Sequence, residues 1–403
     1  MKTTFAVAQL GARMHYAVPR IFHSAGLLDR LFTDICAQKG WPRLLGLVPA
    51  AMQPAGLRRL SGRVVEGVPS SLVTAFNLFG LEYSRRRARA QNPTDSTKVY
   101  LWGGKRFCEL IIKTGLGGAG GVYVFNSAGL ELLEHARKLG LKTVMEQTIA
   151  PTEIELKILA RENAAHPDWE PAASRNDLAK ELADREKAEW KNADIILCGS
   201  EFVRQGIASC GGPAARCKVV PYGVAAGSIA PREPHSGTLR VLTVGAAGLR
   251  KGTPHVLAAA QKLGAKAKFR LAGQIGVSNS ARELLSKHVE LLGPVPRGEI
   301  GKLYEAADVF LLPSLCEGSA TATYEALAAG LPVITTPNAG SVVRDGIDGF
   351  IVPPSIPDAI VEKLALLAAD RTLLNTMSAN ARQRASEFTL EAYSRRLLGA
   401  IGA

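Results

Sequence analysis

The chain has 403 residues, of which 47% are hydrophobic and 21% charged, and this composition excludes a disordered or fibrous protein. The length exceeds one ordinary domain and predicts two domains of roughly 200 residues each. The net charge of +13 lies mostly in residues 1–113, where 17 Lys and Arg stand against 6 Asp and Glu, a composition that favours an anionic partner.

That anionic partner is expected to be a membrane surface or a phosphate-bearing acceptor. Basic motifs interleaved with aromatic residues are missing from the sequence, so we expect no nucleic acid partner. A merely solvated basic face is the alternative. Six cysteines form no Cys-x-x-Cys pair, which predicts neither a zinc nor a disulfide framework and favours a reducing cytoplasm. No apolar stretch nears the roughly 20 residues that span a bilayer. We therefore expect a cytoplasmic location, peripheral on the inner face of the membrane if residues 1–113 bind lipid.

The first half of the chain begins with a strand at residues 3–10, followed at once by a small-residue turn. Residues 16–32 are expected to be mostly helical. Between residues 33 and 113, several Xaa-Pro breaks and a cationic run at 83–89 leave two interpretations open. One is a helix pair lying on anionic lipid, and the other is an ordinary amphipathic core helix. The glycine-dense residues 115–121 lack the Lys-Ser/Thr of a phosphate-binding P-loop.

Strands and helices alternate in the rest of the chain. Strands are predicted at residues 122–125, 142–145 and 193–198, with helices at 130–139, 154–163 and 177–192 between or before them. This alternation predicts a parallel sheet. A segment rich in Pro, Gly and Ser then reads as a linker. Beyond it, strands at 239–244, 268–273, 309–312, 333–336 and 350–352 alternate with helices and predict a second α/β domain, ending in a helix at 388–398.

Residues 306–336 contain the strongest candidates for a ligand-binding site. After the strand at 309–312, Glu317 lies in a small-residue loop and Glu325 in the first turn of the next helix, with seven residues between them. The small residues let backbone N–H groups approach a ligand, and the start of a helix carries a partial positive charge that suits a diphosphate. For either glutamate alone, ordinary compensation of the helix dipole is an equal alternative.

The two glutamates together resemble the Glu-x7-Glu signature of retaining family 4 glycosyltransferases, of the bacterial envelope and exopolysaccharide type. Arg250-Lys251-Gly252, after the strand at 239–244, is a second similarity. The resemblance implies the GT-B fold, an α/β architecture of two Rossmann-like domains facing each other across a cleft. Residues 1–222 would form the acceptor-side domain, 223–237 the linker and 238–385 the nucleotide-sugar-binding domain. Residues 386–403 would form a helix that crosses back to the first domain.

The resemblance also implies roles for individual residues. Lys251, supported by Arg250, would stabilise the leaving diphosphate, while Glu317 would face the donor sugar and Glu325 the ribose hydroxyls. Further nucleotide or diphosphate contacts would come from Gly245, Ser319, Ala320, Thr321, Ala322, Thr323, Val295 and Arg297. The donor and acceptor cleft of the first domain would be lined by Gly11, Ala12, Arg13, His15, Glu146 and Gln147. A surface Arg-Lys pair is the alternative for residues 250 and 251.

Two positions depart from the family pattern. Ala246 stands where the family commonly has an arginine after the strand's glycine, and Glu146 or Gln147 stands where it often has a histidine facing the donor. A second positive charge for binding the phosphates must then come from Arg250 or from another residue. The manner in which the chain contacts the donor hydroxyls is correspondingly open.

The predicted function is retaining transfer of a sugar from a UDP- or GDP-linked donor to a hydroxyl of a lipid-linked or glycan acceptor. No metal and no other cofactor is expected, since the chain contains no Asp-x-Asp and two cations with a helix terminus can hold the diphosphate. The alternative is a non-catalytic sugar-nucleotide-binding subunit of an envelope-polysaccharide assembly. A pyridoxal-phosphate phosphorylase is disfavoured, because the lysine motif of those enzymes is missing.

Overall fold

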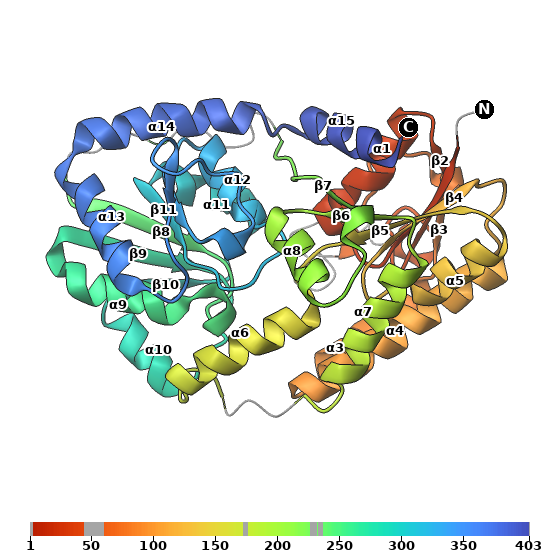
Figure 1. Ribbon diagram of the computed structural model, residues 1–403, viewed down its shortest axis with the longest axis horizontal. Coiled ribbons are helices and arrows are strands. Elements are labelled where there is room, and N and C mark those ends of the chain that lie inside the picture. The colour runs from red at the N-terminus through yellow and green to blue at the C-terminus, as the bar shows by residue number, and fades with distance from the viewer. Residues whose placement is uncertain (1–2, 44–59, 172–175, 226–231, 233–236, 403) are drawn as a thin grey trace.

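Two parallel β-sheets, each covered by helices on both faces, form two lobes in the computed structural model (Figure 1). The structure describes residues 3–43, 60–171, 176–225, 232 and 237–402. The first sheet contains seven strands in the order β3-β2-β1-β4-β5-β6-β7. These strands are β1 (Phe5–Gln9), β2 (Leu28–Thr33), β3 (Val73–Ala75), β4 (Gly121–Phe125), β5 (Lys142–Gln147), β6 (Ile195–Cys198) and β7 (Cys217–Val219).

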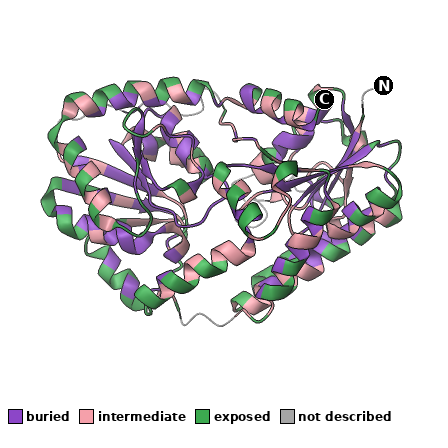
Figure 2. Cartoon of the chain, viewed as in Figure 1, coloured by how far each residue is buried: buried purple, intermediate pink, exposed green. Residues whose placement is uncertain are grey.

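The two strands at the centre of this sheet, β1 and β4, are mostly apolar, as expected when both faces are covered. Every residue of β1 and of β4 is buried, and the two strands pair in parallel with Val7 opposite Tyr123. The covering helices are α1 (Ala17–Ser24), α3 (Asn77–Arg89), α4 (Pro93–Thr114), α5 (Leu130–Lys138), α7 (Ala179–Asn192) and α8 (Glu201–Ser209). Figure 2 shows the buried strands enclosed by helices whose outer faces are exposed.

The expectation of a helix across residues 16–32 was wrong beyond Ser24. Gly26 adopts a left-handed conformation with φ of 69°, and the chain then enters β2, which pairs in parallel with β1. The apolar residues of β2 are buried on both faces of the sheet, and the same spacing of leucines also fits one face of a helix. Tertiary pairing with β1 therefore decided between the two.

The second sheet has six parallel strands in the order β10-β9-β8-β11-β12-β13. They are β8 (Leu239–Val244), β9 (Ala267–Ala272), β10 (Val289–Gly293), β11 (Val309–Leu312), β12 (Val333–Thr335) and β13 (Gly349–Ile351). The helices of this lobe are α9 (Thr253–Leu263), α10 (Asn279–Ser286), α11 (Arg297–Glu305), α12 (Thr321–Ala328), α13 (Pro357–Ala369) and α14 (Arg371–Ser386). None of the helices that the structure describes is long and apolar enough to cross a membrane.

The last helix, α15 (Leu390–Ile401), returns to the first lobe and lies beside α1 in Figure 1. The Lys142 ammonium donates to the carbonyl of Ile401 at 2.6 Å, and Lys218 donates to the carbonyl of Ala400 at 2.7 Å. Both lysines belong to the first sheet and satisfy carbonyls at the end of the helix, which lack partners within it. Two Rossmann-like lobes joined by a crossover helix confirm the predicted fold class.

One element does not respect the expected division at residue 222. The first half of α6 (Thr152–Ala165) packs on the first lobe, where the Thr152 N–H donates to Glu186 at 2.8 Å. Its second half contacts the second lobe, and Leu159 packs against that lobe's core. Figure 1 shows α6 spanning the two lobes. Most of the predicted linker at 223–237 lies outside the described residues.

Each sheet has one point at which the order of its strands reverses. In the first sheet this point lies between β1 and β4, and in the second it lies between β8 and β11. Loops that leave the carboxyl ends of strands diverge there and open a crevice, which is where ligands bind in open α/β sheets. A ligand-binding site is therefore expected at the loops after β1, β8 and β11.

Candidate functional site

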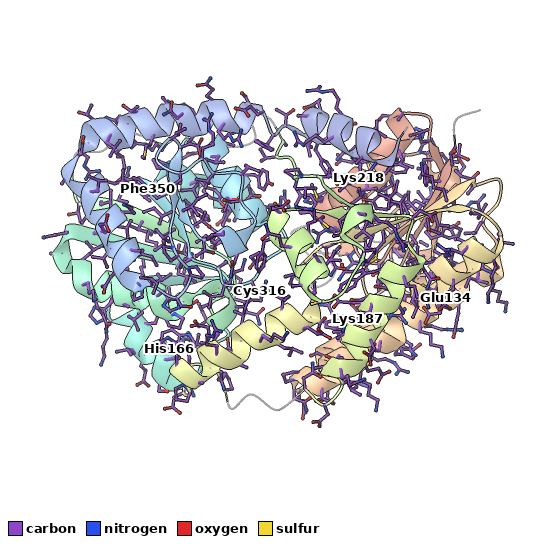
Figure 3. All side chains as sticks on the ribbon, viewed as in Figure 1. Glu134, His166, Lys187, Lys218, Cys316 and Phe350 are labelled. Atoms are coloured by element: carbon purple, nitrogen blue, oxygen red, sulfur yellow. The ribbon has the colours of Figure 1, made fainter. Side chains whose placement is uncertain are left out.

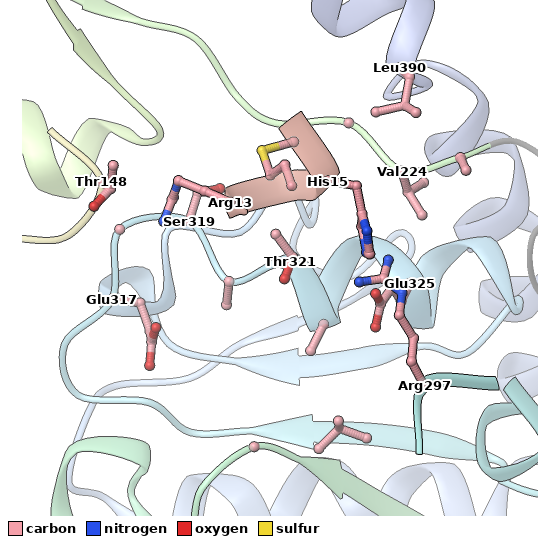
Figure 4. Close-up of a pocket in the computed structure, with 18 of the residues that line it drawn as sticks. Arg13, His15, Thr148, Val224, Arg297, Glu317, Ser319, Thr321, Glu325 and Leu390 are labelled. Atoms are coloured by element: carbon pink, nitrogen blue, oxygen red, sulfur yellow. The ribbon is translucent and has the colours of Figure 1, made fainter. Parts of the chain in front are cut away.

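A cavity of about 820 Å³ lies between the two lobes at these loops (Figure 4). Its volume is in the range of small-molecule sites. Twelve of the predicted site residues line it: Arg13, His15, Gly245, Arg250, Lys251, Arg297, Glu317, Ser319, Ala320, Thr321, Ala322 and Glu325. The turn after β8 and the loop after β11, which are separated by more than 60 residues in sequence, thus form one wall.

A cationic pair sits on Glu317 at the centre of this wall. The Lys251 ammonium lies 2.7 Å from Glu317 Oε1, and Arg250 Nη1 donates to the same oxygen at 2.9 Å. A second Arg250 contact, to the carbonyl of Cys316 at 3.1 Å, fixes the guanidinium against the loop. One carboxylate oxygen therefore holds two positive side chains side by side at the edge of the cavity.

Gly252 brings the lysine turn this close to the loop. It has a φ of 69°, and a Cβ atom there would lie 2.1 Å from the carbonyl oxygen of Pro313 at the end of β11. Only glycine accommodates both the left-handed conformation and that approach. The Arg250-Lys251-Gly252 sequence therefore combines two positive charges at the cavity with the glycine that positions them.

The start of α12 forms the next part of the wall. Ala320 precedes the helix, and its N–H donates to the carbonyl of Ala339 at 3.0 Å, so the turn is anchored to the neighbouring loop. Thr321 is exposed to the cavity and Ala322 partly so. The predicted contact Thr323 is instead fully buried, with its hydroxyl donating to the Ala320 carbonyl at 2.7 Å, and lies outside the lining.

Glu325 is oriented by a tyrosine of α11. The Tyr304 hydroxyl donates to Glu325 Oε2 at 3.0 Å, and burial together with the charge of Glu325 raises the pKa of Tyr304 well above its usual value. The phenol therefore remains a donor and keeps the carboxylate aimed at the cavity. Figure 4 shows His15 and Arg297 pointing toward Glu325 from the other elements. Val295, the other residue predicted near the base, is half-buried and does not line the cavity.

The loop after β1 has an unusual backbone. Met14, His15 and Tyr16 have φ values of 47°, 50° and 58°, in the left-handed region that residues other than glycine rarely enter. Such residues cost of order 1–3 kcal/mol each and persist where the surroundings enforce them. Gln9 supports the turn by donating to the carbonyls of Gly11 and Arg13, both at 3.1 Å. The strained turn presents Met14 and His15 to the cavity, and burial with nearby Arg297 lowers the pKa of His15.

Glu146 and Gln147 do not face the cleft, contrary to the prediction. Glu146 is 3% exposed and accepts hydrogen bonds from Tyr123 at 2.6 Å and Tyr222 at 2.9 Å. Tyr222 in turn accepts a hydrogen bond from Arg13 at 2.7 Å. Glu146 therefore positions Arg13, which lines the cavity, through Tyr222.

Gln147 is fully buried and accepts from Trp190 at 2.9 Å, within the first lobe. Gly11 and Ala12 are half-buried and lie outside the lining of the main cavity. The Gly11 N–H donates instead to Asp34 at 3.0 Å. Of the residues predicted at this turn, Arg13 and His15 line the main cavity, whereas Gly11 and Ala12 do not.

Gly318 is a residue whose role the sequence did not reveal. Its carbonyl accepts from the Ser200 hydroxyl at 2.5 Å, and a Cβ atom on it would lie 1.9 Å from the Thr148 carbonyl oxygen. Thr148 and Ser200 belong to the first lobe, so Gly318 allows the two backbones to touch beside the cavity. Nothing in a small-residue loop distinguishes such a contact from an ordinary turn.

Comparison with known proteins identifies the second lobe by sequence. Residues 229–384 match the family model described as glycosyl transferases group 1. WcaL of Salmonella typhimurium, named for a role in colanic acid biosynthesis, is 27% identical over 228 residues, covering 52% of this chain and 56% of that protein. The UDP-Gal:alpha-D-GlcNAc-diphosphoundecaprenol alpha-1,3-galactosyltransferase of Escherichia coli is 37% identical over 102 residues, covering 25% of this chain and 26% of that protein. The chain thus matches between about a quarter and just over half of these two relatives' lengths.

Solved structures are similar over the whole chain. Anabaena HepE in complex with UDP-glucose has a TM-score of 0.63 at 14% identity, and all of both chains is covered. Sucrose-phosphate synthase from Thermosynechococcus elongatus has a TM-score of 0.65 at 16% identity, covering 98% of this chain and 97% of that one. At these identities the likeness establishes the fold. The chain therefore has the GT-B fold, and the family model for glycosyl transferases group 1 matches its second lobe.

Proposed function

We propose that this chain transfers a sugar, with retention of anomeric configuration, from a nucleotide-diphosphate sugar to a hydroxyl of a lipid-linked or glycan acceptor. The observation that carries the proposal is the placement of Lys251 and Arg250 on Glu317, facing the start of α12 across an interlobe cavity. Paired cations and a helix N-terminus form a site for a diphosphate.

The proposed reaction uses these charges at the leaving group. The bond between the anomeric carbon and the β-phosphate oxygen breaks while the acceptor oxygen bonds to the same face of that carbon. The departing phosphate oxygen takes the proton of the acceptor hydroxyl. Negative charge on the diphosphate grows as its bond to the sugar breaks, so Lys251 and Arg250 stabilise the transition state more than the bound donor. These groups supply the stabilising charge from the protein itself, and we propose that transfer needs no metal.

The donor is proposed to carry uracil rather than guanine, that is, to be a UDP-sugar rather than a GDP-sugar. HepE is described in complex with UDP-glucose, and the Escherichia coli relative is named as using UDP-galactose. We propose that Glu325, whose carboxylate accepts a hydrogen bond from Tyr304, binds the ribose hydroxyls; Arg297 lines the same cavity. The E. coli relative's name also contains a diphosphoundecaprenol acceptor, which supports a lipid-linked acceptor here.

The basic first lobe supports a peripheral position on the inner face of a membrane. Helix α3 exposes Leu78, with 79% of its surface accessible, and also exposes Arg85 and Arg89. These three residues are spaced by seven and four positions and share one face of the helix. An apolar side chain between arginines suits an anionic lipid surface, where a lipid-linked acceptor resides.

The first experiment measures the thermal stability of the protein with UDP and with GDP, because a ligand that binds the folded state raises the melting temperature. We expect UDP to raise it more. A transfer assay with a UDP-sugar panel and lipid extracts follows, with the anomer of the product assigned by NMR. A product of inverted configuration would contradict the mechanism.

The alternative function is a non-catalytic sugar-nucleotide-binding subunit. It is favoured by one observation: Glu146 and Gln147, at the strand end where the family often has a donor-facing histidine, are both buried. Stabilisation by UDP without transfer to any acceptor, and without turnover of the UDP-sugar, would support this alternative.

A further inference from the structure

Three potential metal ligands meet where the end of α6 packs against the start of α9. Glu162 and His166 lie at the end of α6, and His255 lies in the first turn of α9. Glu162 Oε2 is 3.2 Å from His255 Nε2 and 3.9 Å from His166 Nε2. One ligand atom from each of the three residues lies within 4.8 Å of the others. Figure 3 labels His166 near this end of α6, where the helix meets the second lobe.

The geometry points to a binding site for a divalent transition metal, of the zinc type, that fastens α6 to the second lobe. Two imidazoles and one carboxylate form a ligand set that zinc takes in proteins. In a tetrahedral site with bonds of about 2.0–2.1 Å, ligand atoms stand roughly 3.3 Å apart. The Glu162–His255 pair already has that spacing. His166 must approach by roughly 0.6–1.5 Å to reach that spacing, since its ligand atom lies 3.9 Å from Glu162 Oε2 and within 4.8 Å of the His255 ligand atom. Its side chain is 32% exposed at the end of the helix, where it can move.

The surroundings are those of a supported site. Ser355, which follows β13, donates its hydroxyl to Glu162 Oε1, leaving Oε2 for the histidines. Partners of this kind orient the ligands of metal sites and tune their affinity. Glu162 and His255 are 4% and 5% exposed, so an ion there would be shielded from water on one side. Trp169 packs edge-on against His166 at 6.1 Å between ring centroids, and its buried indole N–H has no partner among the described residues.

The site would join two lobes rather than serve transfer. The first half of α6 is bound to the first lobe through Thr152 and Glu186, whereas His255 and Ser355 belong to the second. A metal on Glu162, His166 and His255 would therefore fix the end of α6 to the second lobe, while the start of α6 remains bound to the first lobe. His255 lies four residues after Lys251, so this end of α6 lies next to the turn that carries Arg250 and Lys251.

Zinc titration of chelator-treated full-length protein, followed by calorimetry, tests the proposal. We expect one Zn²⁺ per chain for the unchanged protein. His166→Ala removes a ligand from a half-exposed position and should weaken binding by on the order of 100-fold or more, beyond the 10–100-fold typical of losing a supporting partner. Ser355→Ala removes such a partner and should weaken binding by roughly 10–100-fold. His288→Ala, which changes an exposed histidine outside the cluster, should bind zinc as the unchanged protein does.

Two further readouts separate this site from others in the chain. Co²⁺ in a site of two nitrogens and one oxygen should show visible absorption without the intense near-ultraviolet band of thiolate ligands, and should quench the fluorescence of Trp169. Hydrogen exchange in the second half of α6 should slow when zinc is added to the unchanged protein, but not in His166→Ala. Equal zinc binding by the unchanged protein and His166→Ala, a thiolate band, or no binding at micromolar zinc would each overturn the proposal. None of these measurements depends on sugar transfer.

Discussion

Glu317 shares one of its oxygens between Lys251 and Arg250, and this arrangement determines what a substitution at each position should do. The carboxylate holds two cations that would otherwise repel one another, whereas in the proposed reaction each cation contributes charge to the same diphosphate. Removing a cation therefore acts on the leaving group directly. Removing the carboxylate would act on the placement of both cations.

Lys251→Ala should lower kcat more than it raises KM for the nucleotide sugar. The reason is that the charge on the leaving diphosphate increases between bound donor and transition state, so the lysine contributes most at the transition state. Loss of one preorganised charged donor typically lowers kcat by about 10²–10³-fold. Steady-state release of the nucleotide measures both constants. Lys262→Ala changes an exposed lysine on α9, the helix that follows the turn of Lys251; it is the matched control and should behave as the unchanged protein does. A near-normal kcat in Lys251→Ala would contradict the role.

Glu325→Gln should mainly weaken nucleotide binding. The substitution keeps the size of the side chain and removes the charge that a ribose hydroxyl and the Tyr304 hydroxyl both donate to. Losing a hydrogen bond to a charged group costs roughly 1–3 kcal/mol, which calorimetry with UDP can resolve. Glu362→Gln on α13 serves as the control for removing an exposed carboxylate. Unchanged UDP affinity in Glu325→Gln would remove the ribose contact from the proposal.

At the scale of elements, burial on both faces made some strands easy to predict. β4 and β11 are buried along their whole length, so their sequences are continuous apolar runs that have few alternative interpretations. β2 was missed because the spacing of its leucines also fits a helix. Neither the left-handed turn at Met14–Tyr16 nor the crossing of α6 to the second lobe has a local sequence pattern, since both depend on what packs against them.

The residues of the candidate site also differ in how far the sequence alone could place them. The structure brings Glu317, Glu325 and Lys251 to one cavity. The sequence indicated the two glutamates through a loop and a helix start after an apolar strand, and Lys251 through the resemblance of its turn to the family. Glu146 and Gln147 were misplaced because a strand end was recognised without knowledge of which partners surround it. Tyr123 and Tyr222 fix Glu146 inside the first lobe, and neither tyrosine is near it in sequence.

Gly318→Ala tests the contact between the loop after β11 and the first lobe. Its methyl group would meet the backbone of Thr148, which cannot move aside as a side chain can. We expect the loop carrying Glu317 to shift, with loss of stability of about 1–3 kcal/mol from overpacking. A misplacement on the scale of 1 Å should also lower kcat/KM by about 10²-fold.

Gly399→Ala is the control for Gly318→Ala. It adds the same methyl group in α15 where no atom lies within 4 Å. In a helix interior this change should stabilise by roughly 0.5–1 kcal/mol. Melting temperatures and steady-state kinetics compare the two. Equal activity of both variants would show that the approach of the two backbones is not needed for catalysis.

At the scale of the whole molecule, charge is distributed unevenly between the lobes. Residues 1–113 carry most of the net charge of +13, although Arg250 and Lys251, the cations proposed to bind the diphosphate, lie in the second lobe. The excess on the first lobe is therefore not explained by the proposed nucleotide site. Part of it lies on α3, which carries four arginines against one glutamate. The exposed face of α3 combines Leu78 with arginines and is available to a large anionic surface.

Sedimentation with lipid vesicles should show binding to vesicles that contain an anionic lipid and not to neutral ones, and the binding should fall as salt is added. Each basic residue near such a surface contributes about 1 kcal/mol, so Arg85→Gln with Arg89→Gln should weaken binding by roughly 30-fold. The control replaces two exposed lysines of the second lobe, Lys266 and Lys287, with glutamine and removes the same charge. If both double variants lose binding equally, net charge alone is responsible and α3 is not the membrane-facing element. If the control still binds, the acceptor's membrane lies against the first lobe, with the cleft opening beside it.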